Sequence, residues 1–281
     1  MPQPQTQTEP AAVHGTGDYH LPSEAGGKEC RTEKAHKYSI PKSDVKGVAI
    51  ATGIIIVWAL LFHHGLFHVK LGGEAASSVL HIVAVFASLE FMCTGLFITC
   101  HDAMHGTVAY RNRKLNDFIG WVAISCYALF DYRMLHRKHW LHHNHTGEVK
   151  KDPDFHTGNP NFLVWFASFM VSYSSVMQFV KLGTAANVLQ FLGAPFNNVL
   201  LFMTAAPVIA ALRLFYFGTY LPHLPRAASD VMGWQLSHSS NVSSWQSFFT
   251  CFHFDYHWEH HRWPYAPWWE LDKCKAITAL A

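Results

Sequence analysis

The chain has 281 residues, of which half are hydrophobic and 15% aromatic, while only 14% are charged. An average soluble domain carries about 25% charged residues, so this composition argues against a soluble protein. The net charge of +2 is too small to favour a nucleic-acid partner. Histidine is the outlier, with 21 residues that fall mostly into a few short clusters.

The first 36 residues are polar and rich in Gln, Pro, Glu, Gly and Thr, so they cannot bury a core. They lack both the Arg-rich, acid-poor character of a transit peptide and the apolar centre of a secretory signal. We therefore expect a disordered tail over residues 1–36 and a single membrane-embedded domain over residues 37–281.

Four apolar stretches follow, each long enough for a helix to cross a bilayer, which takes about 20 residues. We expect these spans at residues 47–67, 75–100, 162–180 and about 194–221. Residues 186–192 form either a lead-in to the last span or a tight hairpin with it. The segment 115–135 is weaker because it contains Asp117 and Asp131, and we expect it to lie in the interface or to re-enter. The predicted fold class is all-α integral membrane, with about four transmembrane helices, interfacial or re-entrant helices and a histidine-rich helical cap.

The distribution of Lys and Arg sets the expected orientation, because cytoplasmic segments carry the excess of positive charge. Six lie before the first span, eight in the 101–160 loop and four after the fourth span. The two loops on the other side carry one each, Lys70 and Lys181. We therefore place both termini and the 101–160 loop on the cytoplasmic or stromal face.

The dense histidine clusters all fall on that face. His101 and His105 are four residues apart and share a helix face, and two HxxHH sets would each present three imidazoles on a helix. His223 closes the fourth span. Nine imidazoles suit two metal ions with four or five ligands each, because neutral imidazole is a common nitrogen ligand for iron and zinc. The candidate metal ligands are His101, His105, His139, His142, His143, His223, His257, His260 and His261.

Two irons fit this count better than zinc. A structural zinc site takes four ligands in a closed shell, whereas nine ligands indicate a pair of ions, and a pair of redox-active irons can activate O2. Metal-bound histidines usually donate their second N–H to an acid or amide, so nearby groups of that kind are candidates for support. These are Asn144, Asp152 and Asp154, and the four acids that we take as candidate catalytic residues, Asp102, Asp131, Asp255 and Glu259.

Two ionisable residues lie inside predicted spans. Glu90 precedes His101 by eleven residues and Arg213 precedes His223 by ten, which places them at a similar depth, about 15 Å from the histidine face. Because burying either charge alone is costly, we predict that they pair across the two helices in a structural role. The stretch HRWPYAPWWEL near the C-terminus is either an aromatic anchor in the interface or a roof over the metal site.

The histidine boxes resemble those of the membrane fatty-acid-desaturase-like di-iron superfamily, which carries one HxxxH and two HxxHH. Within it, HDAMHGT, DPDFH, RLFYFGTYLPH and HFDYHWEHHRWPYAPWWEL are similar to the beta-carotene ketolases, particularly those of green algae. The resemblance runs from about residue 37 to residue 274. Four histidines have no clear role in it: His136, His145, His238 and His253.

This resemblance implies oxygenation at C4 of a β-ionone ring. Two successive hydroxylations would give a gem-diol that loses water to a ketone, turning β-carotene into echinenone and canthaxanthin, and 3-hydroxylated rings toward astaxanthin. The implied cofactors are two iron ions with O2 as co-substrate. Electrons would come from an external donor such as ferredoxin, because the chain has no dinucleotide-binding or haem motif. In an alga the membrane would be that of the plastid or the endoplasmic reticulum.

A carotenoid is apolar and dissolved in membrane lipid, so it can reach such a site laterally between helices. A pocket for it would be mostly apolar and aromatic, with Phe97, Phe215 and Tyr216 as candidate lining residues. Two alternatives remain open. Another membrane di-iron oxygenase, such as a fatty-acid desaturase or hydroxylase or a carotenoid 3-hydroxylase, would carry the same boxes. A zinc-binding membrane protein that is not an oxygenase is the second alternative.

Overall fold

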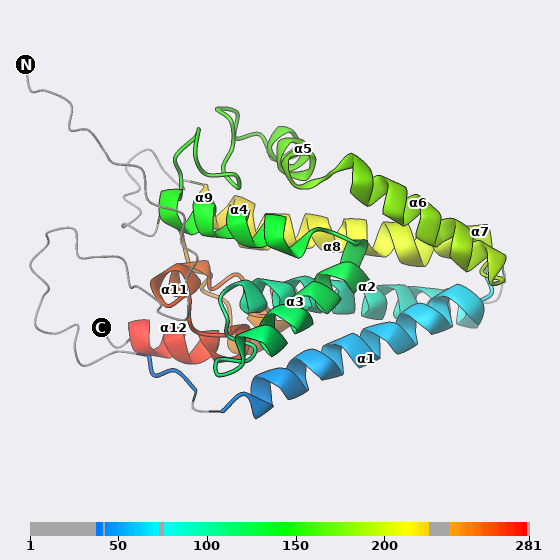
Figure 1. Cartoon of the computed structure of the whole chain (residues 1–281), viewed down its shortest axis with the longest axis horizontal. Helices are drawn as coiled ribbons and strands as arrows, with labels where there is room; N and C mark the ends of the chain where they lie inside the picture. The colour runs from blue at the N-terminus through cyan, green and yellow to red at the C-terminus, as the bar shows by residue number, and fades with distance from the viewer. Residues whose placement is uncertain (1–37, 42, 73–75, 225–235, 280–281) are drawn as a thin grey trace, which may run out of the picture.

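The computed structural model describes residues 38–41, 43–72, 76–224 and 236–279, and within these ranges the chain forms helices and loops without a strand. This confirms the predicted all-α class for the described part. The predicted tail over residues 1–36 lies outside it. Figure 1 shows the long helices side by side along one axis, with the short C-terminal helices gathered at one end.

Three helices are long and apolar enough to cross a membrane. Helices α1 (Val45–Phe67) and α2 (Ala76–Met104) pack against each other, and the third is a continuous run from Phe196 to His223. The outer surface of α1 exposes large apolar side chains such as Ile56 and Leu60. Exposed apolar faces of this kind suit contact with lipid rather than with water. The chain is therefore built as an integral membrane protein.

Two further stretches reach span length only as bent pairs. Helices α3 (Arg113–Ala128) and α4 (Tyr132–His145) meet at 102°, and α5 (Phe162–Tyr173) and α6 (Val176–Phe191) meet at 84°. The number of candidate spans is therefore three to five, depending on how the bent pairs are counted.

The expectation of one straight span over residues 162–180 is wrong. The chain breaks between α5 and α6, where Ser174 and Ser175 adopt extended backbone angles and the Ser175 side chain accepts a hydrogen bond from the Gln178 N–H. A serine that caps the first free N–H groups of a helix starts a new helix in a new direction. The apolar composition on both sides of the serines concealed this break.

The run from Phe196 to His223 changes its hydrogen-bonding pattern along its length. In order, it consists of α7 (Phe196–Asn198), the π-helix η2 (Val199–Ala205), α8 (Ala206–Phe215), the π-helix η3 (Tyr216–Tyr220) and α9 (Leu221–His223). Pro207 does not interrupt it, because its missing N–H falls at the junction of η2 and α8. Short π-helical segments of this kind inside a longer helix are frequent at functional sites.

The connection between α6 and α7 is the tight hairpin rather than the lead-in. Gly193 has a φ of +99°, a left-handed conformation that ends α6, and Pro195 precedes α7. At the same end of the bundle, the Asn198 amide donates hydrogen bonds of 2.8 Å to the carbonyls of Gly65 and Val69. These bonds fix the start of the last long helix to the end of α1.

The predicted pair between Glu90 and Arg213 is confirmed. The Arg213 Nε and Nη2 atoms each donate to a carboxylate oxygen of Glu90 at 2.7 Å, across α2 and α8. The Nη1 atom donates to the carbonyls of Phe249 and Thr250 in α10 (Ser244–Cys251). One partly buried guanidinium therefore connects three helices.

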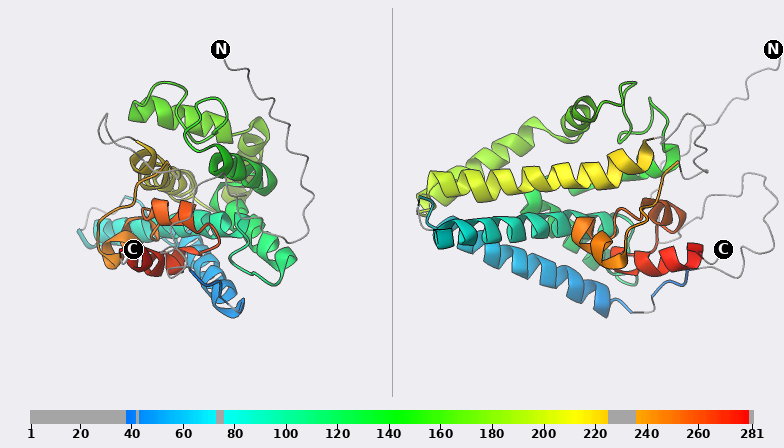
Figure 2. Two further views of the ribbon diagram at one scale, coloured as in Figure 1. Left: turned by 90° about the vertical axis from the view of Figure 1, so that its left-hand side faces the viewer. Right: turned by 180° about the vertical axis from the view of Figure 1, so that it is seen from behind.

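The remaining helices lie at the end of the bundle where α9 finishes. These are α11 (His257–Arg262), the short 3₁₀ helix η4 (Trp268–Glu270) and α12 (Leu271–Ala279). Figure 2 shows them beside the ends of the long helices, opposite the α1–α2 connection. All histidines of the dense clusters that the structure describes are therefore brought to one end of the bundle.

Candidate metal centre

Helix periodicity assembles the first set of imidazoles. His101 and His105 lie one turn apart at the end of α2, and His139 lies on α4. With His260 of α11 they form the first histidine group, whose four ligand nitrogens lie within 4.8 Å of one another and whose residues are all buried. The Nε2 atoms of His105 and His139 are 2.6 Å apart, and those of His101 and His260 are 3.2 Å apart.

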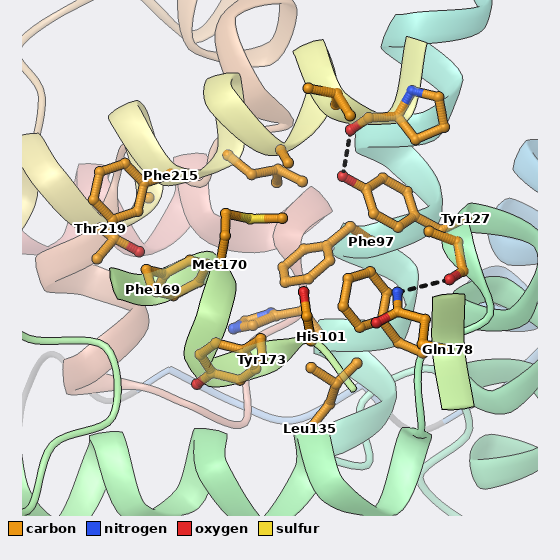
Figure 3. Close-up of a pocket in the computed structure, with 18 of the residues that line it drawn as sticks. Phe97, His101, Tyr127, Leu135, Phe169, Met170, Tyr173, Gln178, Phe215 and Thr219 are labelled. Carbon is orange, nitrogen blue, oxygen red and sulfur yellow. Dashed lines mark hydrogen bonds between the residues drawn. The ribbon is translucent and has the colours of Figure 1, made fainter. Parts of the chain in front are cut away.

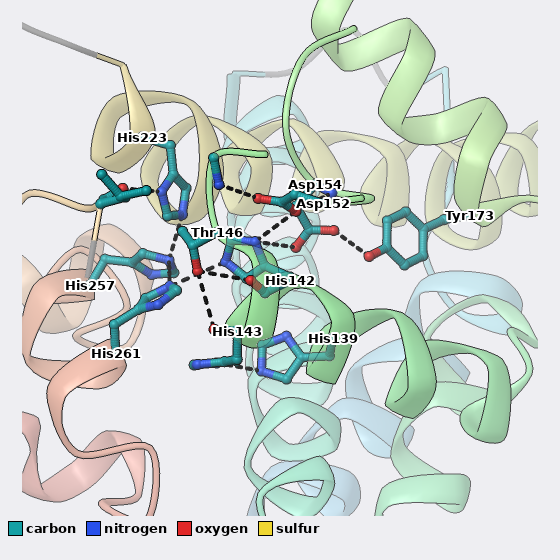
Figure 4. A network of polar contacts seen from close by, with 12 residues as sticks. His139, His142, His143, Thr146, Asp152, Asp154, Tyr173, His223, His257 and His261 are labelled. Carbon is teal, nitrogen blue, oxygen red and sulfur yellow. Dashed lines mark hydrogen bonds and ion pairs between the residues drawn. The ribbon is translucent and has the colours of Figure 1, made fainter. Parts of the chain in front are cut away.

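The second histidine group has the same form and consists of His142, His223, His257 and His261. The Nε2 atom of His261 lies 3.1 Å from that of His142 and 3.0 Å from that of His257. The Nε2 atoms of His223 and His257 are also 3.0 Å apart. Figure 4 shows these rings converging from three helices.

His143, the ninth predicted ligand, lies at the edge of the first group. Its Nε2 atom is 3.1 Å from that of His139 and 3.0 Å from that of His260. Its ring also stacks on His261 at a centroid distance of 4.4 Å, so it lies between the two groups. The structure thus brings together all nine imidazoles, five around the first group and four in the second.

Each HxxHH box divides its histidines between the two groups. On α4, His139 and His143 are one turn apart and face the first group, whereas His142 faces the second. On α11 the one-turn pair, His257 and His261, faces the second group and His260 faces the first. The spacing therefore encodes a pair of ligands for one group and a single ligand for the other. The sequence-based expectation of three imidazoles on one shared face was too simple.

The geometry fits metal ions. Two nitrogens that are each about 2.1 Å from one ion and at a right angle to each other lie about 3.0 Å apart, close to the separations within both groups. Burial, reinforced by neighbouring imidazoles, lowers the pKa of His257, His260 and His261 well below its ordinary value. These rings are therefore neutral at physiological pH and keep a lone pair for a metal. An all-nitrogen donor set suits iron as well as zinc.

Several ligands are held by their second ring nitrogen. The Nδ1–H of His142 donates to Asp152 Oδ1 at 2.9 Å, and that of His223 donates to the carbonyl of Leu236 at 2.8 Å. His101 Nδ1 lies 3.3 Å from Asp102 Oδ1. Contacts of this type fix the tautomer and the orientation of a metal-binding ring.

The loop after α4 supplies two acids of different character. Burial opposes ionisation of Asp152, but the His142 imidazole and the N–H groups of Gly147 and Asp154 lower its pKa on balance. Burial raises the pKa of Asp154 to about 6. Asp154 Oδ2 lies 3.9 Å from His142 Nδ1, and its Oδ1 accepts a hydrogen bond from the Tyr173 hydroxyl, as Figure 4 shows.

The four candidate catalytic acids have different surroundings. Asp102 Oδ1 lies next to His101, and its Oδ2 accepts the backbone N–H of Trp268 at 2.9 Å. Asp131 is exposed and caps α4 by accepting the Met134 N–H at 2.9 Å, so it has a structural role.

The other two candidate acids are buried but contact other partners. Asp255 accepts a hydrogen bond from the Ser247 hydroxyl. Glu259 lies 3.6 Å from the Lys275 ammonium. Only Asp102 of the four has a described contact with a histidine of the two groups. Asp102 thus lies nearest to the two groups and Asp131 caps α4, and the catalytic role of all four acids stays a prediction.

The four histidines without a clear role lie outside both groups. His136 lies 3.1 Å from the Arg113 guanidinium, and His145 lies 3.1 Å from Glu148. His253 contacts the Ser247 hydroxyl at 3.1 Å. The backbone N–H of His238 donates to the Pro222 carbonyl at 2.8 Å, next to His223.

Two supporting groups were missed or undervalued at the sequence level. In the sequence, Asp152 was only one of several candidates to support a ligand. In the structure, it makes the shortest described carboxylate contact to one of the nine histidines. Its position in the DPDFH motif was the sequence feature that could have singled it out. The sequence could not identify the Leu236 carbonyl as the partner of His223, because every residue has a backbone carbonyl. In the HRWPYAPWWEL stretch, the backbone N–H of Trp268 donates to Asp102, which places this part of the stretch next to the partner of His101.

Replacing Asp152 with asparagine should lower the ketone formation that the resemblance to the ketolases implies about 10- to 100-fold, the usual cost of losing an outer partner of a metal-binding histidine. The amide keeps the shape of the side chain but loses the charge that orients the His142 N–H. Pigment analysis of matched membranes measures the effect. Unchanged activity in Asp152→Asn would show that the backbone of this loop, rather than the carboxylate, holds His142.

Replacing Gly218 with alanine should also impair the site. A Cβ at Gly218 would lie 2.3 Å from the Phe254 ring, and that ring packs on His101 at 4.6 Å and on His257 at 5.1 Å. Relief of the clash displaces Phe254 toward ligands of both groups. We expect at least about a tenfold loss of turnover and reduced iron retention. Gly53→Ala on the exposed side of α1, where a Cβ also meets nothing within 4 Å, is the matched control.

An apolar cavity of about 450 Å³ ends at the histidines (Figure 3). His101 and His139 of the first group and His142 and His257 of the second line it. Most of the remaining wall is aliphatic and aromatic. Phe97 and Phe215 contribute to it as expected, but Tyr216 does not; it packs on Phe162 instead.

Comparisons with known proteins agree with this site. The sequence profile of the fatty acid desaturase family matches residues 76–280. The chain is 60% identical to the zeaxanthin 4-ketolase of Chlamydomonas reinhardtii, 56% to the beta-carotene 4-ketolase of Protosiphon botryoides and 54% to beta-carotene 4-ketolase 3 of Haematococcus lacustris.

Each of these alignments covers 92% of the chain. It covers 60%, 71% and 88% of the three relatives, so the chain spans about three fifths of the length of the Chlamydomonas protein. No solved structure matches the chain. A profile match over most of the chain, together with identities above one half, shows that it belongs to the fatty acid desaturase family and, within it, to the beta-carotene ketolases.

Proposed function

We propose that the protein is a carotenoid 4-ketolase that uses two iron ions, O2 and external electrons to introduce a keto group at C4 of β-ionone rings. The single observation that carries this proposal is the apolar cavity that ends at both histidine groups. Nine nitrogen ligands give each of two ions four or five partners. The names of the relatives, zeaxanthin and beta-carotene ketolases, supply the ring position.

The shape of the cavity supports a long, rod-like substrate. Along the last long helix its wall runs from Thr219, near the histidines, to Met203. At about 1.5 Å per helical residue this is a length of about 24 Å. A two-ring carotenoid is about as long as the hydrocarbon core of a bilayer, roughly 30 Å. The cavity can therefore hold one ring at the histidines and most of the polyene behind that ring.

The chain's own residues position the ring and the ligands. Met104, Leu135 and Phe254 surround the histidine end of the cavity and keep bulk water from it. Asp152 and Asp102 orient His142 and His101 through their Nδ1 atoms. When bound, the irons supply the activation of O2 with electrons from outside the chain. Each hydroxylation at C4 consumes one O2, two electrons and two protons and releases one water, and the gem-diol then loses water to give the ketone.

Further features of the proposal concern the membrane. We propose that residues 37–281 form one domain, that the bundle crosses the membrane four times and that the histidine end faces the cytoplasm or stroma, where the Lys and Arg residues concentrate. A soluble redox protein such as ferredoxin would deliver electrons at that face. In an algal cell, the host membrane would be that of the plastid or the endoplasmic reticulum.

The test is expression in cells that accumulate β-carotene, followed by chromatography and mass analysis of the pigments. We expect echinenone and canthaxanthin, and astaxanthin where 3-hydroxylated rings are also present. New double bonds in acyl lipids, or 3-hydroxylated carotenoids without ketones, would instead identify another di-iron oxygenase. Activity that persists without O2 and iron would identify a zinc protein.

A further inference from the structure

A second apolar cavity of about 150 Å³ adjoins the first. Five residues line both: Tyr127, Ala128, Leu182, Met203 and Pro207. No histidine lines the second cavity, and its own wall includes Trp58 and Phe62 of α1, Leu189 of α6 and Phe202 of η2. The shared residues Met203 and Pro207 place the second cavity beside the far end of the first, remote from Thr219 and the histidines, and Leu189 lies one helical turn beyond the part of α6 that lines the first cavity.

Tyr127 is one of the residues that lie between the two cavities. It is buried at the end of α3, and its hydroxyl donates to the Pro207 carbonyl at 2.8 Å, the hydrogen bond drawn in Figure 3. Its ring also lies 6.0 Å from that of Phe97, which lines the first cavity. Of the five shared residues, Tyr127 is the one whose side chain is held by a hydrogen bond to another of them, Pro207, so rotation of Tyr127 would widen the connection between the two spaces.

The length of the substrate requires such an extension. The first cavity follows the last helix for about 24 Å, whereas a two-ring carotenoid measures roughly 30 Å. With one ring at the histidines, the other ring reaches past Met203, to the level at which the second cavity begins. Its mostly apolar and aromatic wall suits a hydrocarbon ring.

We infer that the second cavity receives the distal ring of a two-ring carotenoid, with Tyr127 as the residue that controls access to it. This inference rests on the proposed function. It assigns Tyr127 and the second cavity to the selection of substrate length, remote from the reacting carbon. A carotenoid with one ring and a short polyene does not reach beyond Tyr127.

Binding measurements on the full chain in lipid nanodiscs test this. The probes are β-carotene and retinal, which has one such ring and half of the polyene, and quenching of tryptophan fluorescence reports both. Ala185→Phe fills the second cavity alone and should weaken β-carotene binding at least about tenfold while leaving retinal binding unchanged. Tyr127→Phe removes the hydrogen bond to Pro207 and should tighten β-carotene binding severalfold.

The matched control is Val188→Phe, on the same helix but exposed and outside both cavities. Ser125→Phe fills the second cavity from α3 and replaces Ala185→Phe should that variant not fold. Unchanged β-carotene binding in the filled variants, or an equal loss for both probes, would overturn the inference and place the distal ring in lipid. Binding needs neither iron nor turnover, so this failure is distinct from an absence of ketones in the expression test.

Discussion

If the proposed di-iron function holds, replacing His139 with alanine is expected to abolish ketone formation and to reduce bound iron from about two ions per chain to about one. His139 Nε2 lies 2.6 Å from His105 Nε2 and 3.1 Å from His143 Nε2, so its loss opens the middle of the first group. Removing only an outer partner of a ligand usually costs about 10- to 100-fold, and removing the ligand itself should cost more. Pigment analysis and elemental analysis of the purified protein measure the two effects.

His145→Ala is the matched control for that experiment. It lies on the same helix, but its ring pairs with Glu148 and belongs to neither group. We expect it to keep its iron and to retain activity within about twofold, as for an exposed ion pair. If His139→Ala still forms canthaxanthin, then the first group is not the oxygenating centre.

Removing Arg213 from the Glu90–Arg213 pair is expected to destabilise the protein by about 3–5 kcal/mol, the usual cost of leaving a buried charge alone, and removing Glu90 should cost less because the Arg213 side chain is 30% exposed. Glu90 is 3% exposed, and both of its oxygens accept from the guanidinium at 2.7 Å. Arg213→Leu should be the more damaging change, because it also removes the donors to Phe249 and Thr250. Thermal unfolding in nanodiscs gives the measurement.

The double variant Glu90→Leu/Arg213→Leu separates charge from packing. Two apolar side chains need no partner, so the double variant should recover part of the stability lost by Glu90→Leu alone. The bonds from Arg213 to α10 remain lost, which limits the recovery. Additive losses in the double variant would mean that the two residues do not stabilise each other.

The pairing of Glu90 and Arg213 could be predicted because few charges lie within spans and each needs a partner. The helix break at Ser174–Ser175 could not, since an apolar stretch of span length gives the same composition whether it is straight or bent. The π-helices η2 and η3 also have no clear sequence signature. Composition therefore predicts which segments enter the membrane, and local hydrogen bonding decides their path through it.

At the site, the spacing of the histidines in the sequence was enough to identify the nine candidate ligands. It did not show which of the two groups each histidine joins. The split of each HxxHH box depends on which neighbouring helix each ring faces, and that follows from the packing of α2, α4, α9 and α11. Supporting acids were harder to predict. Asp131 and Asp152 both lie close to α4 in the sequence, yet the first caps the helix and the second holds His142.

The division of each box between two groups also governs how the centre is completed during synthesis. A nascent chain that has not yet reached α11 offers the second group only His142 and His223, two of its four imidazoles. The first group then still lacks His260. Neither group is complete until the ribosome has delivered α11 to the end of an already inserted bundle. Completion of both groups therefore depends on a helix that begins only at His257, late in the chain.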